Sequence, residues 1–140
     1  MKKYIDELKY YKKLATSPMN PTYDEILKAN SLRGNEIKKT PLIYSSTFSN
    51  LTNSEIYLKA EFRQKTGSFK IRGAYYKIKL LSEEEKKHGV VAASAGNHAQ
   101  GVALASSLEN ISCTIVMPKN ASPAKVAATR GYGANVILEG

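Results

Sequence analysis

One lysine in this chain stands where nucleophilic chemistry is favoured. Gly67 and Ser68 form a turn and N-cap signal ahead of residues 71–81, whose apolar positions have helical spacing. Lys70 is therefore expected in the first turn of a helix. The positive end of the helix dipole disfavours an ammonium group there, and partial burial beside Phe69 would do the same. Both effects favour the neutral amine, which can attack a carbonyl carbon and form a Schiff base.

A second group of polar residues follows a short apolar run. Residues 90–93 are typical of a buried parallel strand, and residues 97–108 have the pattern of a helix. Residues 94–96 would form the turn between them. Gly96 allows a ligand to approach the backbone closely, and the free N–H groups of the helix start attract an anion such as a carboxylate. The Asn97 amide can donate to an oxygen atom without adding charge.

These two segments, TGSFKIRGA and SAGNHAQG, resemble the lysine segment and the asparagine loop of pyridoxal-phosphate (PLP) enzymes of the tryptophan-synthase-β fold, most closely the threonine dehydratases. The likeness covers residues 22–140, with one departure at Phe62-Arg63, where the family usually has Asn-Leu. Shorter matches in the family's order are Thr40-Pro41-Leu42, Lys59-Ala60-Glu61 with Gln64 and Thr66-Gly67, residues 114–118, and Tyr132-Gly133-Ala134.

The resemblance implies a cofactor, a reaction and a set of site residues. PLP would be held covalently by Lys70 and would act as an electron sink. The freed Lys70 would take the α-proton of L-threonine, with L-serine as a further candidate, and loss of the β-hydroxyl would lead to a 2-oxo acid and ammonia. The resemblance assigns cofactor binding to Phe69, Lys70 and Asn97, and the substrate carboxylate to Ser94, Gly96, Asn97 and His98.

Two positions inside the motifs separate branches of the family. Cysteine and threonine synthases usually carry aspartate directly after the lysine, where this chain has Ile71, so the dehydratase and serine-racemase branch is favoured. Racemases of this branch need a second acid/base, commonly a serine at the position of Ala95. A methyl group cannot carry a proton, so elimination is favoured over racemization. Serine racemase remains an alternative.

The elements that must position these residues follow from apolar spacing and cap signals. From residue 90 the order strand, helix, strand, helix, strand forms a βαβαβ unit, which predicts a parallel sheet with right-handed crossovers. The resemblance implies an α/β protein with the three-layer PLP fold type II. Residues 1–80 would belong to the larger PLP-binding domain, and residues 81–140 would form the smaller βαβαβ domain with the asparagine loop. Other expected elements are helices over residues 4–15 and after Thr22, strands at 42–44, 56–59, 112–117 and 135–138, and helices from Ser82 and over 122–130.

Composition limits the other possibilities. A net charge of +9 raises a nucleic-acid hypothesis, but the basic residues are scattered and no aromatic-basic motif or zinc-ligand spacing accompanies them. No apolar run approaches membrane-spanning length. The single Cys113 is expected to be a small buried hydrophobe, which agrees with a reducing cytoplasm. We expect a cytoplasmic homo-oligomer that binds an amino-acid substrate, with no nucleic-acid, membrane or metal partner.

Two features of the family have no match in these 140 residues. The glycine-rich loop for the PLP phosphate is one, since no run of three glycines occurs, and the Ser or Cys beside the pyridine nitrogen is the other. The chain also ends directly after a predicted strand. We expect a truncated chain that is inactive alone. The hypothesis from a different class is a non-catalytic module, or one subunit of a split PLP-fold protein.

Overall fold

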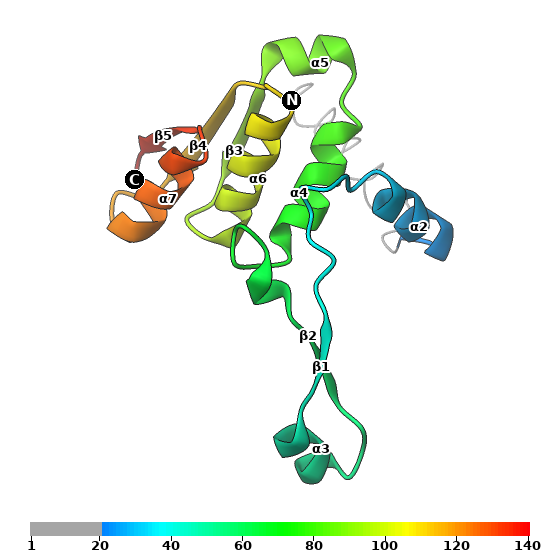
Figure 1. Ribbon diagram of the computed structural model, residues 1–140. Helices are drawn as coiled ribbons and strands as arrows, with labels where there is room; N and C mark the ends of the chain where they lie inside the picture. The colour runs from blue at the N-terminus through cyan, green and yellow to red at the C-terminus, as the bar shows by residue number, and fades with distance from the viewer. Residues whose placement is uncertain (1–20) are drawn as a thin grey trace, which may run out of the picture. The chain divides into compact units, whose positions relative to one another are not determined.

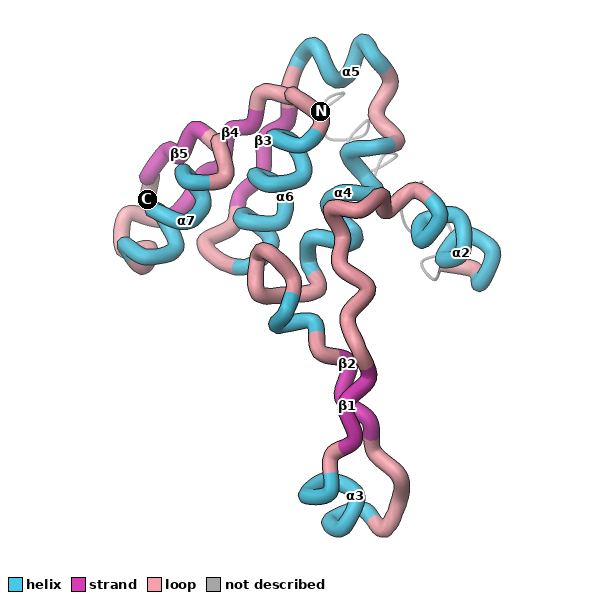
Figure 2. Tube along the Cα trace, in the orientation of Figure 1, coloured by secondary structure: helices cyan, strands magenta, loops and turns pink. Residues whose placement is uncertain are grey.

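Two sheets organise residues 21–140, the part of the chain that the computed structural model describes (Figure 1). The first is an antiparallel pair of β1 (Leu42–Tyr44) and β2 (Tyr57–Lys59), joined through α3 (Ser46–Thr52). Figure 2 shows this pair as a narrow ribbon that extends away from the helices that follow it. The second sheet is parallel, with the order β3 (Val90–Ala93), β4 (Cys113–Met117) and β5 (Asn135–Leu138).

The chain divides after Leu32 into two compact units, and the first contains α2 (Tyr23–Ser31). A capping box starts this helix: the Glu25 N–H donates to the Thr22 hydroxyl at 3.3 Å, and the Thr22 N–H donates to the Glu25 carboxylate at 2.7 Å. The hydrogen bonds that the Thr22 N–H and hydroxyl donate to the Glu25 carboxylate lower the pKa of that carboxyl. The helix predicted after Thr22 is confirmed, whereas the one predicted over residues 4–15 lies outside the described residues.

The second unit contains the remaining described helices: α3, η1 (Glu61–Arg63), α4 (Lys70–Lys79), α5 (Glu83–His88), α6 (Asn97–Leu108) and α7 (Pro123–Gly131). The last four begin and end close to the predicted positions, whereas α3 and η1 were not predicted. Ser82 caps α5 with a capping box, as its sequence indicates. α4 buries Ile71, Ala74, Tyr75 and Ile78, the positions that the helical spacing predicts.

The parallel βαβαβ unit is confirmed by the strand register. Ala92 pairs with Ile115, and Ile115 pairs with Val136. Ile115 and Val136 are buried on the helix-covered face of the sheet, whereas Val91 on the opposite face is 75% exposed. The prediction that residues 90–93 are buried is therefore wrong for Val91 and Ala93, which are exposed, whereas Val90 and Ala92 are half-buried against the core. β3 is an edge strand, and none of residues 21–140 covers its outward side chains.

α6 forms the centre of this unit because its side chains are small. Ala99, Ala103 and Ala105 are fully buried, so α4 and the sheet can both approach the helix closely. Cys113 on β4 is buried as predicted, and this burial raises the pKa of its thiol. None of the helices over residues 21–140 is both long and apolar enough to cross a membrane.

Candidate active site

The first residues of α4 and α6 lie at the same end of the second unit. The two helices run side by side in the same direction (Figures 1 and 2). Their carboxyl-terminal ends are joined by Lys79 Nζ, which lies 2.8 and 2.9 Å from the two carboxylate oxygens of Glu109. Lys70 begins α4 and Asn97 begins α6, and β3 ends at Ala93 just before the asparagine loop. The prediction that Lys70 lies in a first helical turn is confirmed.

Both of these helices start without a side-chain cap. Phe69 is the N-cap residue of α4 and Gly96 is that of α6, and neither helix receives a capping hydrogen bond from a side chain. α7 also starts without a side-chain cap, whereas α2, α3 and α5 are capped by hydroxyl groups. The uncapped starts of α4 and α6 present backbone N–H groups and positive dipole ends at one end of the unit, which suits an anionic ligand.

The predicted N-cap role of Ser68 is wrong. Phe69 already has helical backbone angles, and its carbonyl accepts the Arg72 N–H at 3.0 Å, so a first-turn donor is satisfied by the backbone. Ser68 is buried instead. Its hydroxyl has no hydrogen-bond partner within the described part of the chain.

The predicted partial burial of Lys70 is also wrong within residues 21–140. Lys70 is exposed and Phe69 is 60% exposed, because the contact between α4 and α6 uses Ile71 and the positions in phase with it. The Lys70 ammonium lies 5.3 Å from the centroid of the Phe69 ring, a cation–π contact. None of the salt bridges formed within residues 21–140 includes Lys70. Its amine is thus accessible.

Backbone and hydroxyl hydrogen bonds hold the asparagine loop. The Ser94 N–H donates to the Val116 carbonyl at 3.1 Å, which extends the β3–β4 ladder by one residue. The Ser94 hydroxyl accepts the Gly96 N–H at 3.3 Å, so its own hydrogen is left to donate elsewhere. Asn97 is exposed at the helix start. His98, the remaining predicted residue, lines a groove of about 280 Å³ between α4 and β3, and neither Lys70 nor Asn97 lines that groove.

A polar network behind Lys70 was not assigned a role by the sequence reasoning. Arg72 donates two hydrogen bonds to the Glu61 carboxylate, from Nε at 2.8 Å and from Nη2 at 2.7 Å. The Thr40 hydroxyl also donates to Glu61, and Arg72 reaches the Lys38 carbonyl at 3.1 Å. The Arg72 guanidinium, helped by Thr40, lowers the pKa of the Glu61 carboxyl from 4.5 to about 2. This network attaches the first turn of α4 to the segments on either side of the ribbon.

Gln64 extends the network by pairing with the main chain. Its side-chain oxygen accepts the Lys38 N–H at 3.1 Å, and its amide nitrogen donates to the Lys38 carbonyl at 2.9 Å. Lys59 Nζ donates to the Thr40 carbonyl at 2.5 Å. The K-x-E-x-x-Q spacing was the sequence signal for this network, because the side chains of Lys59, Glu61 and Gln64 all form hydrogen bonds with residues 38–40.

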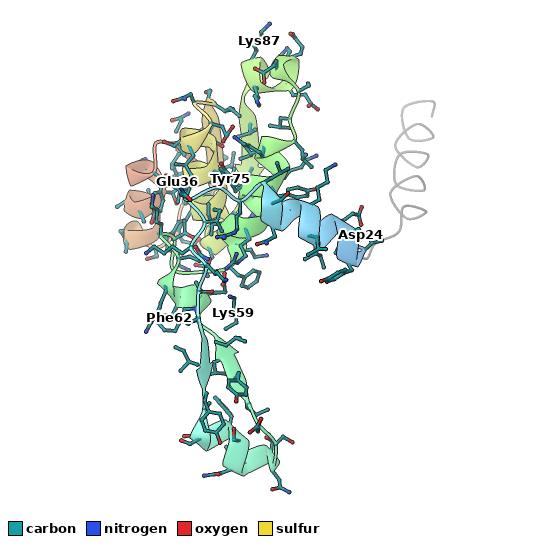
Figure 3. The ribbon with its side chains drawn as sticks, turned by 45° about the vertical axis from the view of Figure 1, so that its right-hand side comes forward. Asp24, Glu36, Lys59, Phe62, Tyr75 and Lys87 are labelled. Atoms are coloured by element: carbon teal, nitrogen blue, oxygen red, sulfur yellow. The ribbon has the colours of Figure 1, made fainter. Side chains whose placement is uncertain are left out.

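The departure at Phe62-Arg63 leaves this network intact. Phe62 is 69% exposed, and the Arg63 guanidinium lies 5.9 Å from the centroid of its ring. In Figure 3, Phe62 and Lys59 lie where the ribbon joins the helices. Both unusual side chains are therefore on the surface of η1, away from the buried Gln64.

The chain belongs to the family described as pyridoxal-phosphate dependent enzymes, whose model matches residues 34–139. It is 60% identical over 119 residues to the L-threonine ammonia-lyase of Thermotoga maritima, and 58% identical over 105 residues to a catabolic L-threonine dehydratase of Staphylococcus aureus. These matches cover 85% and 74% of the chain, and the chain spans 30% of each relative. The crystal structure of serine racemase from Dictyostelium discoideum superposes with a TM-score of 0.79 at 43% identity, over 84% of this chain and 38% of that one.

Proposed function

We propose that this chain carries the covalent lysine and the substrate-carboxylate loop of a PLP-dependent threonine ammonia-lyase. The observation that carries the proposal is the position of Lys70, an accessible amine at the start of α4, at the same end of the unit as Asn97 at the start of α6. When bound, PLP supplies an electron sink for bonds to the substrate α-carbon.

The residues present fit that cofactor. PLP is an anionic aldehyde, so it requires an accessible amine, positive surroundings and a donor for its ring oxygen. Lys70 supplies the amine, the uncapped starts of α4 and α6 supply positive dipole ends, and Asn97 supplies a neutral donor. The exposed ring of Phe69 beside Lys70 offers an apolar face against which the cofactor ring could pack.

Each residue of the chain then has a defined task. Lys70 Nζ would accept the substrate α-proton, and the β-hydroxyl would then be lost. The Ser94 hydroxyl and the backbone around Gly96, Asn97 and His98 would hold the substrate carboxylate, with the Gly96 N–H orienting the Ser94 hydroxyl. The Glu61–Arg72 pair would fix the helix turn from which Lys70 projects.

Threonine elimination is favoured over serine racemization by two observations. The relatives to which the chain is 60% and 58% identical are an L-threonine ammonia-lyase and an L-threonine dehydratase. Ala95 lies in the turn of the asparagine loop, where its methyl group can neither donate nor accept a proton. L-Threonine is therefore the proposed substrate, with L-serine second.

The organisation of the whole enzyme is part of the same proposal. Residues 1–80 would belong to the larger domain and residues 81–140 to the smaller one, in a three-layer fold that assembles as a homo-oligomer. The exposed face of the parallel sheet, with Val91 75% and Ile137 45% exposed, is apolar surface that a further layer would cover.

Borohydride reduction tests the proposal. In the complete natural protein loaded with PLP, reduction should leave a phosphopyridoxyl label on Lys70 and on no other lysine. Lys70→Ala should abolish label and threonine deamination without loss of folding, because the side chain is exposed. Lys65→Ala, which changes a surface lysine paired with Glu36, is the control and should keep both. A label at another lysine would refute the assignment.

A further inference from the structure

Gly101 lies in the middle of α6, where the backbone of α4 approaches closely. A Cβ atom on Gly101 would lie 3.2 Å from the carbonyl carbon and oxygen of Lys70, and 3.2 Å from the backbone nitrogen of Ile71. Ordinary van der Waals contact of such an atom begins at 3.4 Å. Gly101 is not among the glycines with positive φ, so its backbone conformation does not require glycine. Glycine is therefore needed at position 101 because α4 and α6 approach each other closely there, and not because of its backbone angles.

The atoms that a methyl group would meet belong to the main chain. A flexible side chain could rotate away from an added methyl, but the first turn of a helix yields only if the helix moves. α4 is tied to α6 at its far end by the Lys79–Glu109 pair. A methyl group on Gly101 would consequently displace the near end of α4, which carries Lys70.

Gly101 is also in register with the asparagine loop. It follows Asn97 by four residues, one turn along α6, so the two residues lie on the same face of the helix. Side chains on a helix lean toward its amino terminus, so Lys70 projects from its contact with Gly101 in the direction in which Asn97 lies. The distance of α4 from Gly101 thus sets how far the lysine stands from the start of α6.

We propose that Gly101 is a positioning residue for the reaction. Because it has no side chain, the backbone of Lys70 lies close enough to α6 for Lys70 Nζ to reach a cofactor bound at Asn97. This inference rests on the proposed function, in which Lys70 binds PLP covalently. A displacement of about 1 Å can cost a pair of reacting groups about a hundredfold in rate. A shift of α4 that the fold tolerates should therefore impair the chemistry of Lys70.

The test compares Gly101→Ala with Gly131→Ala in the complete natural protein. Gly131 ends α7, and a Cβ atom there would meet nothing within 4 Å, so it is a matched control. Four quantities are measured: the unfolding temperature without PLP, the rate at which the visible absorbance of the Lys70–PLP bond appears after PLP is added, and kcat and KM for threonine. In Gly101→Ala the bond should form roughly tenfold more slowly and kcat should fall at least about tenfold, with KM less affected. Its PLP-free unfolding temperature should stay close to that of the control, whose other values should match the unmodified protein.

Unchanged bond formation and kcat in Gly101→Ala would overturn the inference. So would a Gly101→Ala protein that is unfolded without PLP, because the glycine would then be needed for folding as such. If the unmodified protein acquires no borohydride label on Lys70, the proposed function itself fails and this inference falls with it. A labelled Lys70 with an unaffected Gly101→Ala variant overturns the positioning role only.

Discussion

Replacing Glu61 by glutamine should destabilise the 140-residue chain at neutral pH and much less in acid. The Glu61 carboxyl has its pKa lowered from 4.5 to about 2, chiefly by the two hydrogen bonds from Arg72. A shift of that size corresponds to about 3 kcal/mol of stability if taken at face value. The side chains of Glu61 and Arg72 are 15% and 34% exposed, so solvent screening reduces the expected value to about 1–2 kcal/mol.

The pH dependence follows from the direction of the shift. Because the folded pKa is the lower one, the stabilisation is complete above the unfolded value of 4.5 and disappears as the pH falls from 4.5 toward 2. At about pH 3 more than half of it should be lost, since the unfolded chain binds the proton first. Glu61→Gln has no carboxyl to titrate and should show a correspondingly flatter profile.

Urea unfolding followed by circular dichroism at a series of pH values would measure this difference. Glu36→Gln is the matched control, because Glu36 forms an ion pair with Lys65 whose side chains are 41% and 47% exposed. That variant should differ from the unmodified chain by less than about 1 kcal/mol at every pH. A Glu61→Gln difference that is as large at about pH 3 as at neutral pH would refute the reasoning, since packing and not charge would then account for it.

Three further predictions concern catalysis and folding. Ala95→Ser in the complete natural protein should create detectable serine racemization by supplying a proton carrier opposite Lys70, and efficient racemization by the unmodified enzyme would contradict the inference from Ala95. The 140-residue chain mixed with PLP and threonine should form no sustained 2-oxobutanoate, because it encodes no glycine-rich phosphate loop; an enzyme-like rate would show that it is complete. Ser82→Ala should speed amide hydrogen exchange in α5 and cost about 1 kcal/mol locally by removing the capping box, whereas unchanged exchange would show that packing alone holds the helix.

Local patterns predicted most of the elements because the forces behind them act over a few residues. The spacing of Ile71, Ala74, Tyr75 and Ile78 marks the buried face of α4 without knowledge of its partner. The Ser82 capping box starts α5 through contacts within one turn. The strand and helix order from residue 90 was sufficient to predict the parallel sheet, since crossovers of one hand join parallel strands.

Failures of the sequence reasoning occurred where burial in the folded chain decided the outcome. Ser68 has the residue type of an N-cap, yet Phe69 takes that position and the Ser68 hydroxyl is buried without a hydrogen-bond partner in residues 21–140. Burial of residues 90–93 depends on what covers each face of an edge strand, which an apolar run alone does not show.

The site itself illustrates the same division. The motifs identified Lys70 and Asn97 as chemical groups, because their residue types and neighbours carry that information locally. Their placement at one end of two parallel helices depends on two contacts. One is the close approach of Lys70 to Gly101, which are 31 positions apart in the chain, and the other is the Glu61–Arg72 ion pair, whose residues are 11 positions apart. Such contacts follow from close packing and from hydrogen bonds between distant segments, and only the folded chain brings them together.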